Sequence, residues 1–438
     1  MISQFNELSI NDKDFQVNLD IYLKKRSMNS HEVSSTVAEI IDLIRTQGDS
    51  GLKKLTYDLD GFECEDFLLT DEEKEECLNG FDDEMLISLE FSFQQLLNFQ
   101  SKCFSSLKLN THDSITRKFR KIDKVGMYIP GGKASYPSTV LMGAAPAIAC
   151  GIEDISLASP AIDGKVNDLT VVAAKIAGIK KIYKIGGAQA IAAFALGTEQ
   201  IPKVDKIIGP GNVYVAEAKK QLFGQVGIDS IAGPSEILIL ADESSDPETV
   251  AWDLMAQSEH DTDASSILIS TSSQLIQNVK EIINKEVSSL ERSDIISQAL
   301  LSNGLFINID NLTESKKIIN SIAPEHLHIA FDHDNFEDED NLKAGLILKG
   351  KDSANSLSDY VLGPSHILPT NSSAKFSSPL SVEDFLVSYS YVRLDQTIDP
   401  KSFEEYVKHT SKIANAEGLT AHAISALSLI HISEPTGL

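Results

Sequence analysis

The stretch IYKIGGAQ, residues 182–189, decides the fold class: a short apolar run ends in two glycines, and a helical pattern follows. The same order recurs in KIIGPGN, residues 206–212, and in VGMYIPGG, residues 125–132. Short strands that alternate with helices predict βαβ units and a mainly parallel sheet. A second set of apolar runs lies at 237–241, 267–270, 305–309 and 346–348.

Two sets of strands predict an α/β protein with two Rossmann-like, doubly wound domains and helical extensions at both ends. Ligands would bind at the carboxyl ends of the strands between the two domains. A chain of 438 residues is long enough for two to three domains. The expected parts are an N-terminal helical extension (1–25), a discontinuous first α/β domain (26–127 and 239–380), a second α/β domain (128–238) and a C-terminal helical tail (381–438).

The formal net charge of −26 argues against nucleic acid and anionic membranes as partners. The longest apolar stretch, Val140–Ile152, is interrupted by Pro146 and falls short of the roughly 20 residues that span a bilayer. The first residues are polar and acidic, without the apolar region of a signal peptide. The cysteines are widely spaced and read as reduced thiols of a cytoplasmic protein: Cys64, Cys77, Cys103 and Cys150.

Gln257 and His260 stand three residues apart near the end of an expected helix, so an amide and an imidazole would project from one face. Asp246 is a suitable N-cap for this helix, and Pro247 fits its first turn. A metal ion can use such a pair. The alternative is a hydrogen-bonded histidine at a helix C-terminus, where positive charge is favoured.

Glu325 and His326 stand side by side in the run IAPEHLHI. Histidine can take up a proton near neutral pH, and the adjacent carboxylate could orient a water molecule. If the end of this run is a strand, His326 and His328 share one face while the leucine and isoleucine between and after them fill the other. Ordinary surface charge is the alternative.

Four further groups of polar residues remain open between a site and a structural role. Gln189 and Asn212 follow glycine turns that can hold a phosphate or that merely permit a tight bend; neither turn is a complete G-x-G-x-x-G. Asp359, Tyr360 and His366 lie in a loop rich in glycine, proline and serine, and an Asx-turn is their alternative. Glu417 and His422 would otherwise belong to a capped helix. A zinc site without cysteine could be formed by Gln257, His260, Asp359 and His422.

Taken together, these segments resemble the histidinol dehydrogenase family over nearly the whole chain. The stretches that carry the resemblance are VGMYIPGGKASYPSTVLMGAAPA, IGGAQAIAAFALGTE, VDKIIGPGNVYVAEAKK, AGPSEILILAD, AQSEHD, APEHL, GPSHILPT and AEGLTAH. Any one of them is unspecific, but their common order and spacing are not.

The resemblance implies a homodimer with NAD and one zinc ion per subunit, which oxidises L-histidinol through the aldehyde to L-histidine. It implies zinc ligands at Gln257, His260, Asp359 and the partner subunit's His422. His326 would be the general base, and Glu325 would activate water. The residues around the substrate would be Ser235, Tyr360, His366 and the partner subunit's Glu417, together with Glu325 and the zinc ligands; those around NAD would be Tyr128, Gln189 and Asn212.

The chain departs from the family after Ala426, where a charged amphipathic helix is expected and ALSLIHISEPTGL follows. We expect a foreign end from about Leu427, which would weaken zinc binding. Other functions that the residues leave open are a dehydrogenase of another small alcohol such as a sulfonated diol, a zinc hydrolase and a non-enzymatic binding protein. Ser235, His366 and Glu417 suit a cationic imidazole substrate and argue against the sulfonated diol.

Overall fold

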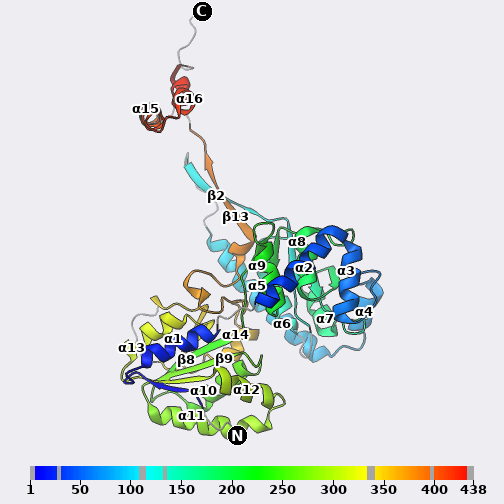
Figure 1. Ribbon diagram of the computed structural model, residues 1–438, viewed down its shortest axis with the longest axis vertical. Coiled ribbons are helices and arrows are strands. Elements are labelled where there is room, and N and C mark those ends of the chain that lie inside the picture. Colours follow the sequence, from blue (N-terminus) through cyan, green and yellow to red (C-terminus); the bar gives the residue numbers. More distant parts are fainter. Residues whose placement is uncertain are drawn as a thin grey trace, which may run out of the picture. The chain divides into compact units, whose positions relative to one another are not determined.

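The computed structural model describes residues 5–26, 31–107, 115–131, 136–332, 341–394 and 399–431 (Figure 1). By its internal contacts the chain divides into two units. Unit 1 comprises Met1–Ser106 and Lys121–Leu386, and unit 2 comprises Leu107–Arg120 and Val387–Leu438. In the described part of the chain, no helix combines the length and the apolar character needed to cross a membrane.

The first sheet of unit 1 has six parallel strands. In spatial order they are β1 (Glu7–Ser9), β10 (Leu305–Asn308), β9 (Ser265–Ser270), β8 (Glu236–Ala241), β11 (His326–Ile329) and β12 (Leu346–Lys349). Successive side chains of a strand point to opposite faces, so Ile237 and Ile239 pack under one layer of helices while Leu238 and Leu240 pack under another. The first layer is α10 (Pro247–Ser258), α11 (Ser273–Glu286) and α12 (Ser293–Asn303), and the second is α1 (Phe15–Arg26) and α13 (Leu312–Ile322).

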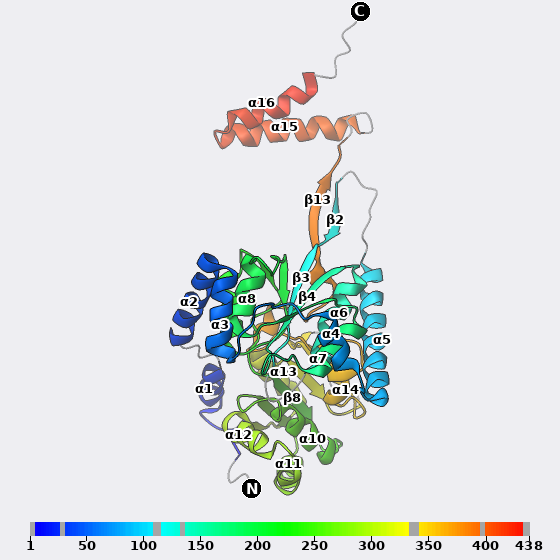
Figure 2. The ribbon, with the colours of Figure 1, turned by 90° about the vertical axis from the view of Figure 1, so that its right-hand side faces the viewer.

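The second sheet of unit 1 has five parallel strands, drawn in cyan to green in Figure 2. Their order is β5 (Lys181–Lys184), β4 (Asp154–Ser159), β3 (Lys124–Tyr128), β6 (Lys206–Ile208) and β7 (Gly227–Ile228). One face packs against α2 (His31–Gln47), α3 (Asp49–Leu55), α8 (Gly187–Leu196) and α9 (Val213–Leu222). On the other face Gly143 lies close to Met127 and Ile208, within a layer formed by α5 (Asp83–Ser106), α6 (Pro137–Ala149) and α7 (Asp168–Ile176).

The remaining short elements of unit 1 connect these layers. Helix α4 (Asp71–Leu78) begins with a capping box, in which the Thr70 side chain and Glu73 exchange hydrogen bonds. A π-helical turn covers Thr56–Asp60, and 3₁₀ turns cover Val287–Ser289, Ser373–Lys375 and Val382–Phe385. Helix α14 (Asn355–Tyr360) follows β12 and carries two of the expected site residues.

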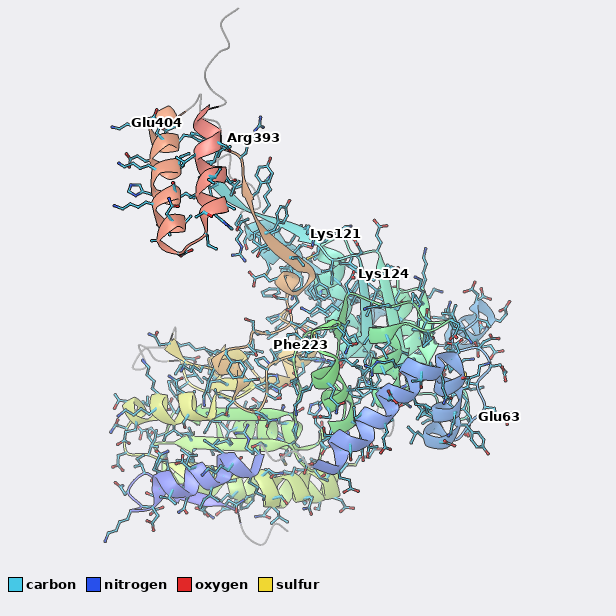
Figure 3. All side chains as sticks on the ribbon, turned by 45° about the horizontal axis from the view of Figure 1, so that its top comes forward. Glu63, Lys121, Lys124, Phe223, Arg393 and Glu404 are labelled. Carbon is cyan, nitrogen blue, oxygen red and sulfur yellow. The ribbon has the colours of Figure 1, made fainter. Side chains whose placement is uncertain are left out.

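Unit 2 contains a two-stranded sheet and a pair of helices. Strand β2 (Ile115–Lys121) pairs with β13 (Leu386–Val392), where the Arg117 guanidinium donates to Ser388 Oγ at 3.0 Å. Lys121 ends β2 and is labelled in Figure 3. Helices α15 (Pro400–Ala416) and α16 (Thr420–His431) pack against each other and bury Val407, Ala414 and Ala423.

The sequence predicted this architecture in its main lines. Parallel strands form at all the expected runs, helices cover both faces of each sheet, and α10 begins where Asp246 and Pro247 were expected to start it. The short edge strands β1 and β7 and the pair β2–β13 were not predicted. The domain boundaries remain predictions, but residues 31–55, assigned to the first domain, pack on the five-stranded sheet, and the N-terminal extension adds β1 to the six-stranded one.

Candidate active site

The expected site residues of the six-stranded sheet lie at the amino ends of its strands. Ser235 directly precedes β8, Glu325 directly precedes β11, and His326 is the first residue of β11. Gln257 lies in the last turn of α10, which returns to this same edge before β9 begins. The expected site residues of this sheet therefore lie at the amino ends of its strands and not at the carboxyl ends, where ligands were expected, because the crossover helix α10 brings its C-terminus back to the amino edge.

The residues expected to contact NAD lie at the carboxyl ends of the five-stranded sheet. Tyr128 ends β3, Gln189 lies in the first turn of α8 after β5, and Asn212 caps α9 after β6. A hydrogen bond connects this sheet's helix α6 to the loop that follows α14: Thr139 Oγ1 lies 3.1 Å from His366 Nε2. The structure thus brings residues of both sheets together within unit 1.

His326 is held in one tautomer. Its Nδ1 lies 3.1 Å from the backbone oxygen of Glu236, and because a carbonyl can only accept, Nδ1 carries the proton. Nε2 is buried and has no hydrogen bond of good geometry among the described residues, although Asp359 Oδ1 is 3.4 Å away. The basic nitrogen of a 2% exposed imidazole is therefore free to meet a ligand.

The charges around His326 shift three pKa values. Burial lowers the pKa of His326, but the carboxylates of Glu325 and Asp359 outweigh burial and raise it well above its usual value. Burial raises the pKa of Glu325, and the charge of His326 only partly offsets that effect. Burial alone would raise the pKa of Asp359 too, but the nearby imidazoles, that of His326 first, lower it.

Asn355 joins two of the expected zinc ligands. From the first turn of α14 its Nδ2 donates to Gln257 Oε1 at 3.1 Å and to Asp359 Oδ2 at 3.2 Å. Its own backbone N–H donates to the carboxylate of Asp253, and Asp253 in turn lies 2.9 Å from His328 Nδ1. All of these side chains except that of Asp359 are at most 3% exposed, so this is a chain of buried polar groups.

No role was expected for Asn355 or Asp253, and His328 was expected only to share a strand face with His326. That reading of the strand is confirmed, because Leu327 and Ile329 fill the core on the other face. The signals available were the four-residue spacing from Asn355 to Asp359 and the second histidine of the strand.

The donor set of this cluster suits zinc. Gln257 supplies an amide oxygen, Asp359 a carboxylate, and His260, two residues beyond the end of α10, an imidazole close enough to lower the pKa of Asp359. Within the described part of a single chain, no three histidine, cysteine, aspartate or glutamate side chains form a metal cluster. The expected set has only two such residues per chain, since its third donor is an amide and its fourth is the partner subunit's His422.

The remaining expected substrate residues have the following positions. Ser235 is half-buried, and its backbone oxygen accepts from Ser265 at 2.9 Å. Tyr360 is 56% exposed at the end of α14. His366 Nδ1 donates to the backbone oxygen of Asp359 at 3.0 Å, and burial lowers the pKa of His366. Glu417 and His422 belong to unit 2, at the end of α15 and in the first turn of α16, and both are exposed.

The three residues expected around NAD each have a protein partner. Tyr128 Oη accepts from the backbone N–H of Gly187 at 3.0 Å, and burial raises the pKa of Tyr128 to about 12. Gln189 donates to Asp60 at 3.2 Å, a contact that the sequence did not indicate. Asn212 Oδ1 caps α9 by accepting from two backbone N–H groups, which leaves its amide nitrogen for a ligand.

The turn before Asn212 has a structural need for glycine. Gly209 has φ +108°, and a Cβ there would lie 2.0 Å from the Tyr128 backbone oxygen. A buried ion pair also holds this turn. Lys219 Nζ lies 2.6 Å from Asp229 Oδ1 and donates to the Gly209 backbone oxygen at 2.5 Å. Asp229 Oδ2 accepts from the Gly209 N–H at 2.7 Å.

An α/β fold of two parallel sheets, with a buried carboxylate–imidazole pair next to a cluster of oxygen and nitrogen donors, is an arrangement typical of enzymes. Comparison with known proteins specifies which one. The sequence profile of histidinol dehydrogenase matches residues 23–428. The chain belongs to the histidinol dehydrogenase family, and it is an oxidoreductase of histidine biosynthesis.

Individual relatives agree with this assignment. The histidinol dehydrogenase of Clostridium acetobutylicum is 43% identical over 92% of this chain and 93% of its own. That of Oceanobacillus iheyensis is 42% identical over 91% and 94%. The crystal structure of histidinol dehydrogenase from Elizabethkingia anophelis superposes with a TM-score of 0.89 at 30% identity, covering 98% of this chain and 99% of that one. The alternative functions considered from the sequence are not favoured.

Proposed function

We propose that the protein is an NAD-dependent, zinc-containing histidinol dehydrogenase of the cytoplasm that oxidises L-histidinol through L-histidinal to L-histidine. The observation that carries this proposal is the state of His326. A buried imidazole with its proton fixed on Nδ1 and an unengaged Nε2, next to a second titratable group, is what two successive proton-coupled oxidations require.

In the first step His326 removes the hydroxyl proton of the alcohol at Nε2. Because the carboxylates of Glu325 and Asp359 raise the pKa of His326, the ring acts as the base only after it has lost its second proton. In that neutral ring the Glu236 carbonyl keeps the remaining proton on Nδ1 and leaves the lone pair on Nε2. Two NAD molecules, bound one after the other, would each accept one hydride, the first from the alcohol and the second from the hydrated aldehyde. Tyr128, Gln189 and Asn212 would orient each of them from the carboxyl ends of the five-stranded sheet.

In the second step Glu325 removes a proton from the water that adds to the aldehyde. Its Oε2 is held by the backbone N–H of Glu236 at 2.7 Å, so Oε1 is the oxygen left to receive the proton. Burial raises the pKa of Glu325, which makes its carboxylate a more effective base. Loss of a hydride from the hydrated aldehyde would leave the carboxylic acid, which ionises to the carboxylate.

Zinc, when bound by Gln257, His260, Asp359 and the partner subunit's His422, would supply an anchor for the nitrogen atoms of the substrate. Ser235, Tyr360, His366 and the partner subunit's Glu417 would border the same substrate. The support for a homodimer with shared sites is the exposure of Glu417 and His422 and the incomplete donor set of one chain.

The test measures NADH absorbance when zinc-loaded protein is mixed with L-histidinol and NAD. We expect two NADH per histidinol, and a loss of about 10²–10⁴-fold in kcat for His326→Gln. His409→Gln is the matched control, because His409 is an exposed histidine paired with Glu405, and it should retain full activity. Absence of NADH formation by the zinc-loaded wild type would refute the proposal, and full activity of His326→Gln would refute the assignment of the base.

A further inference from the structure

Glu236 has a buried side-chain carboxylate that plays no part in the mechanism described above, which uses only the backbone of this residue. It is the first residue of β8, it is 2% exposed, and it touches both Glu325 and His326. We propose that Glu236 is a positioning residue that fixes Glu325 and His326 for catalysis. This inference rests on the proposed function.

The backbone of Glu236 makes one contact to each member of the pair. Its N–H donates to Glu325 Oε2 at 2.7 Å, and its carbonyl oxygen lies 3.1 Å from His326 Nδ1. The parallel pairing of β8 with β11, in which His326 is the partner of Ile237, sets this geometry. The register of two strands therefore determines where both titratable groups sit.

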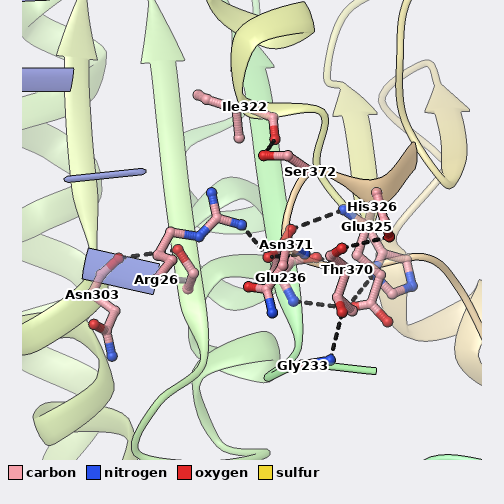
Figure 4. A network of polar contacts seen from close by, with 12 residues as sticks. Arg26, Gly233, Glu236, Asn303, Ile322, Glu325, His326, Thr370, Asn371 and Ser372 are labelled. Carbon is pink, nitrogen blue, oxygen red and sulfur yellow. Dashed lines mark hydrogen bonds and ion pairs between the residues drawn. The ribbon is translucent and has the colours of Figure 1, made fainter. Parts of the chain in front are cut away.

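The side chain of Glu236 stabilises the pairing of β8 with β11 at the amino ends of the two strands. Its Oε2 accepts from the Glu325 N–H at 3.3 Å, and its Oε1 accepts from the Asn371 N–H at 2.9 Å (Figure 4). Asn371 and Ser372 have φ of 52° and 62°, in the left-handed region, which asparagine tolerates and which serine seldom adopts. The Glu236 carboxylate therefore connects Glu325, which directly precedes β11, to the turn at Asn371 and Ser372. Ser372 also anchors this turn by donating to the Ile322 backbone oxygen at 2.6 Å.

Arg26 supplies the positive charge that lets two carboxylates lie next to each other. Its guanidinium forms an ion pair with Glu236 Oε1, and its side chain is 8% exposed. The helix that carries it, α1, is held by Tyr22, whose hydroxyl lies 2.5 Å from Ser265 Oγ and donates to the Asn303 oxygen at 2.6 Å. Removal of one member of a buried pair would leave the other charge uncompensated.

Replacement of Glu236 by glutamine has a specific consequence. A glutamine has a single acceptor oxygen, whereas three donors converge on the carboxylate, from Arg26, Asn371 and Glu325. The amide oxygen keeps two of these donors, Arg26 and Asn371, only in the position of Oε1. The NH₂ group then faces the Glu325 N–H, so we expect Glu325 and with it the His326 ring to be displaced. A displacement of about 1 Å at reacting groups can reduce the rate about 100-fold.

The experiment compares Glu236→Gln with wild type in the NADH assay, starting either from L-histidinol or from L-histidinal. We expect kcat to fall about 10–100-fold from both substrates, while zinc content and KM for L-histidinol change less than about threefold. The double variant Arg26→Gln/Glu236→Gln removes the unpaired cation, so it should fold better than Glu236→Gln and still show the low kcat. Glu236→Asp, which keeps the charge, should recover part of kcat.

Val279→Ala is the control for a purely structural effect, because Val279 is a fully buried apolar residue of α11. It should lower the melting temperature and leave kcat at the wild-type value. Wild-type kcat in a folded Glu236→Gln, or in the double variant if the single one does not fold, would overturn the proposal. An equal loss of kcat in Val279→Ala would also overturn it. If the wild type forms no NADH, both the dehydrogenase assignment and the positioning role of Glu236 are refuted. If the wild type is active and Glu236→Gln is equally active, only the positioning role is refuted.

Discussion

Replacement of Asn355 by leucine should weaken zinc binding while the fold persists. Leucine has nearly the same shape, so the change removes the two hydrogen bonds from Nδ2 to Gln257 and Asp359 without opening a cavity. The Asn355 backbone N–H to Asp253 is unaffected. Both proposed ligand side chains then lose the group that holds them side by side.

The expected magnitude follows from these two bonds. A hydrogen bond to a neutral amide oxygen contributes about 1 kcal/mol, and one to a carboxylate about 1.5–3 kcal/mol. Part of this sum affects folding rather than metal binding. Loss of a group that orients metal ligands typically costs 10–100-fold in affinity, which is about 1.4–2.7 kcal/mol.

The assay measures zinc transfer from the protein to a chelating dye, so it does not depend on catalysis. Ser356→Ala is the matched control, since Ser356 is an exposed neighbour on the same helix, and its zinc affinity should equal that of wild type. Thermal unfolding of the zinc-free proteins would show that each variant is folded. A folded Asn355→Leu with the zinc affinity of wild type would refute the role of Asn355.

Three further predictions concern other parts of unit 1. Asp229→Asn leaves the Lys219 ammonium unpaired at 2% exposure, so urea unfolding should show a loss of about 3–5 kcal/mol, and an unchanged midpoint would contradict the buried pair. Gly209→Ala places a Cβ 2.0 Å from a backbone oxygen of β3, so the NADH assay should show a raised KM for NAD; a KM equal to that of wild type would mean that the turn tolerates a side chain. Burial raises the pKa of Cys77 to about 11 and that of Cys150 to about 12, from an ordinary 9.0. Since only the thiolate reacts, iodoacetamide at pH 8 should modify both cysteines at least about 100-fold more slowly than a free thiol. The modification rates should rise about tenfold per pH unit. Mass spectrometry after timed labelling measures these rates, and rapid labelling at pH 8 would contradict the prediction.

Local patterns were enough to predict the sheets, because an apolar run that ends in glycine before a helical stretch carries its own signal. The edge strands β1 and β7 carry none: they have three and two residues and exist only because a neighbouring strand pairs with them. Likewise, the sequence pointed to Glu325 and His326 as an adjacent acid and base. It could not show that the tautomer of His326 depends on a carbonyl 90 residues away.

The residues that support the expected ligands could not be predicted from the sequence, for a different reason. Asn355 lies in the first turn of α14, and its contact to Gln257 spans 98 residues. The sequence did not single out Glu236, because a strand pattern says nothing of the charge that Arg26 brings from a helix 210 residues earlier. Such long-range polar contacts follow from the topology, which a pattern of local periodicities does not contain.

The topology also explains why the site draws on opposite ends of its two sheets. In the six-stranded sheet a crossover helix ends at the amino edge, so Gln257 at the end of α10 lies at the same edge as Glu325 and His326 at the start of β11. In the five-stranded sheet the turns at the carboxyl ends, with N–H groups at helix starts, are where we propose that the nucleotide binds. The Asp359 carbonyl fixes the His366 proton on Nδ1, so the Thr139 hydroxyl donates to Nε2 and links the two sets. Hydride transfer needs the substrate and the nucleotide to be in contact. In the proposed site the groups that transfer protons belong to one sheet and the groups that bind the nucleotide belong to the other, so the strand register of each sheet positions its own set.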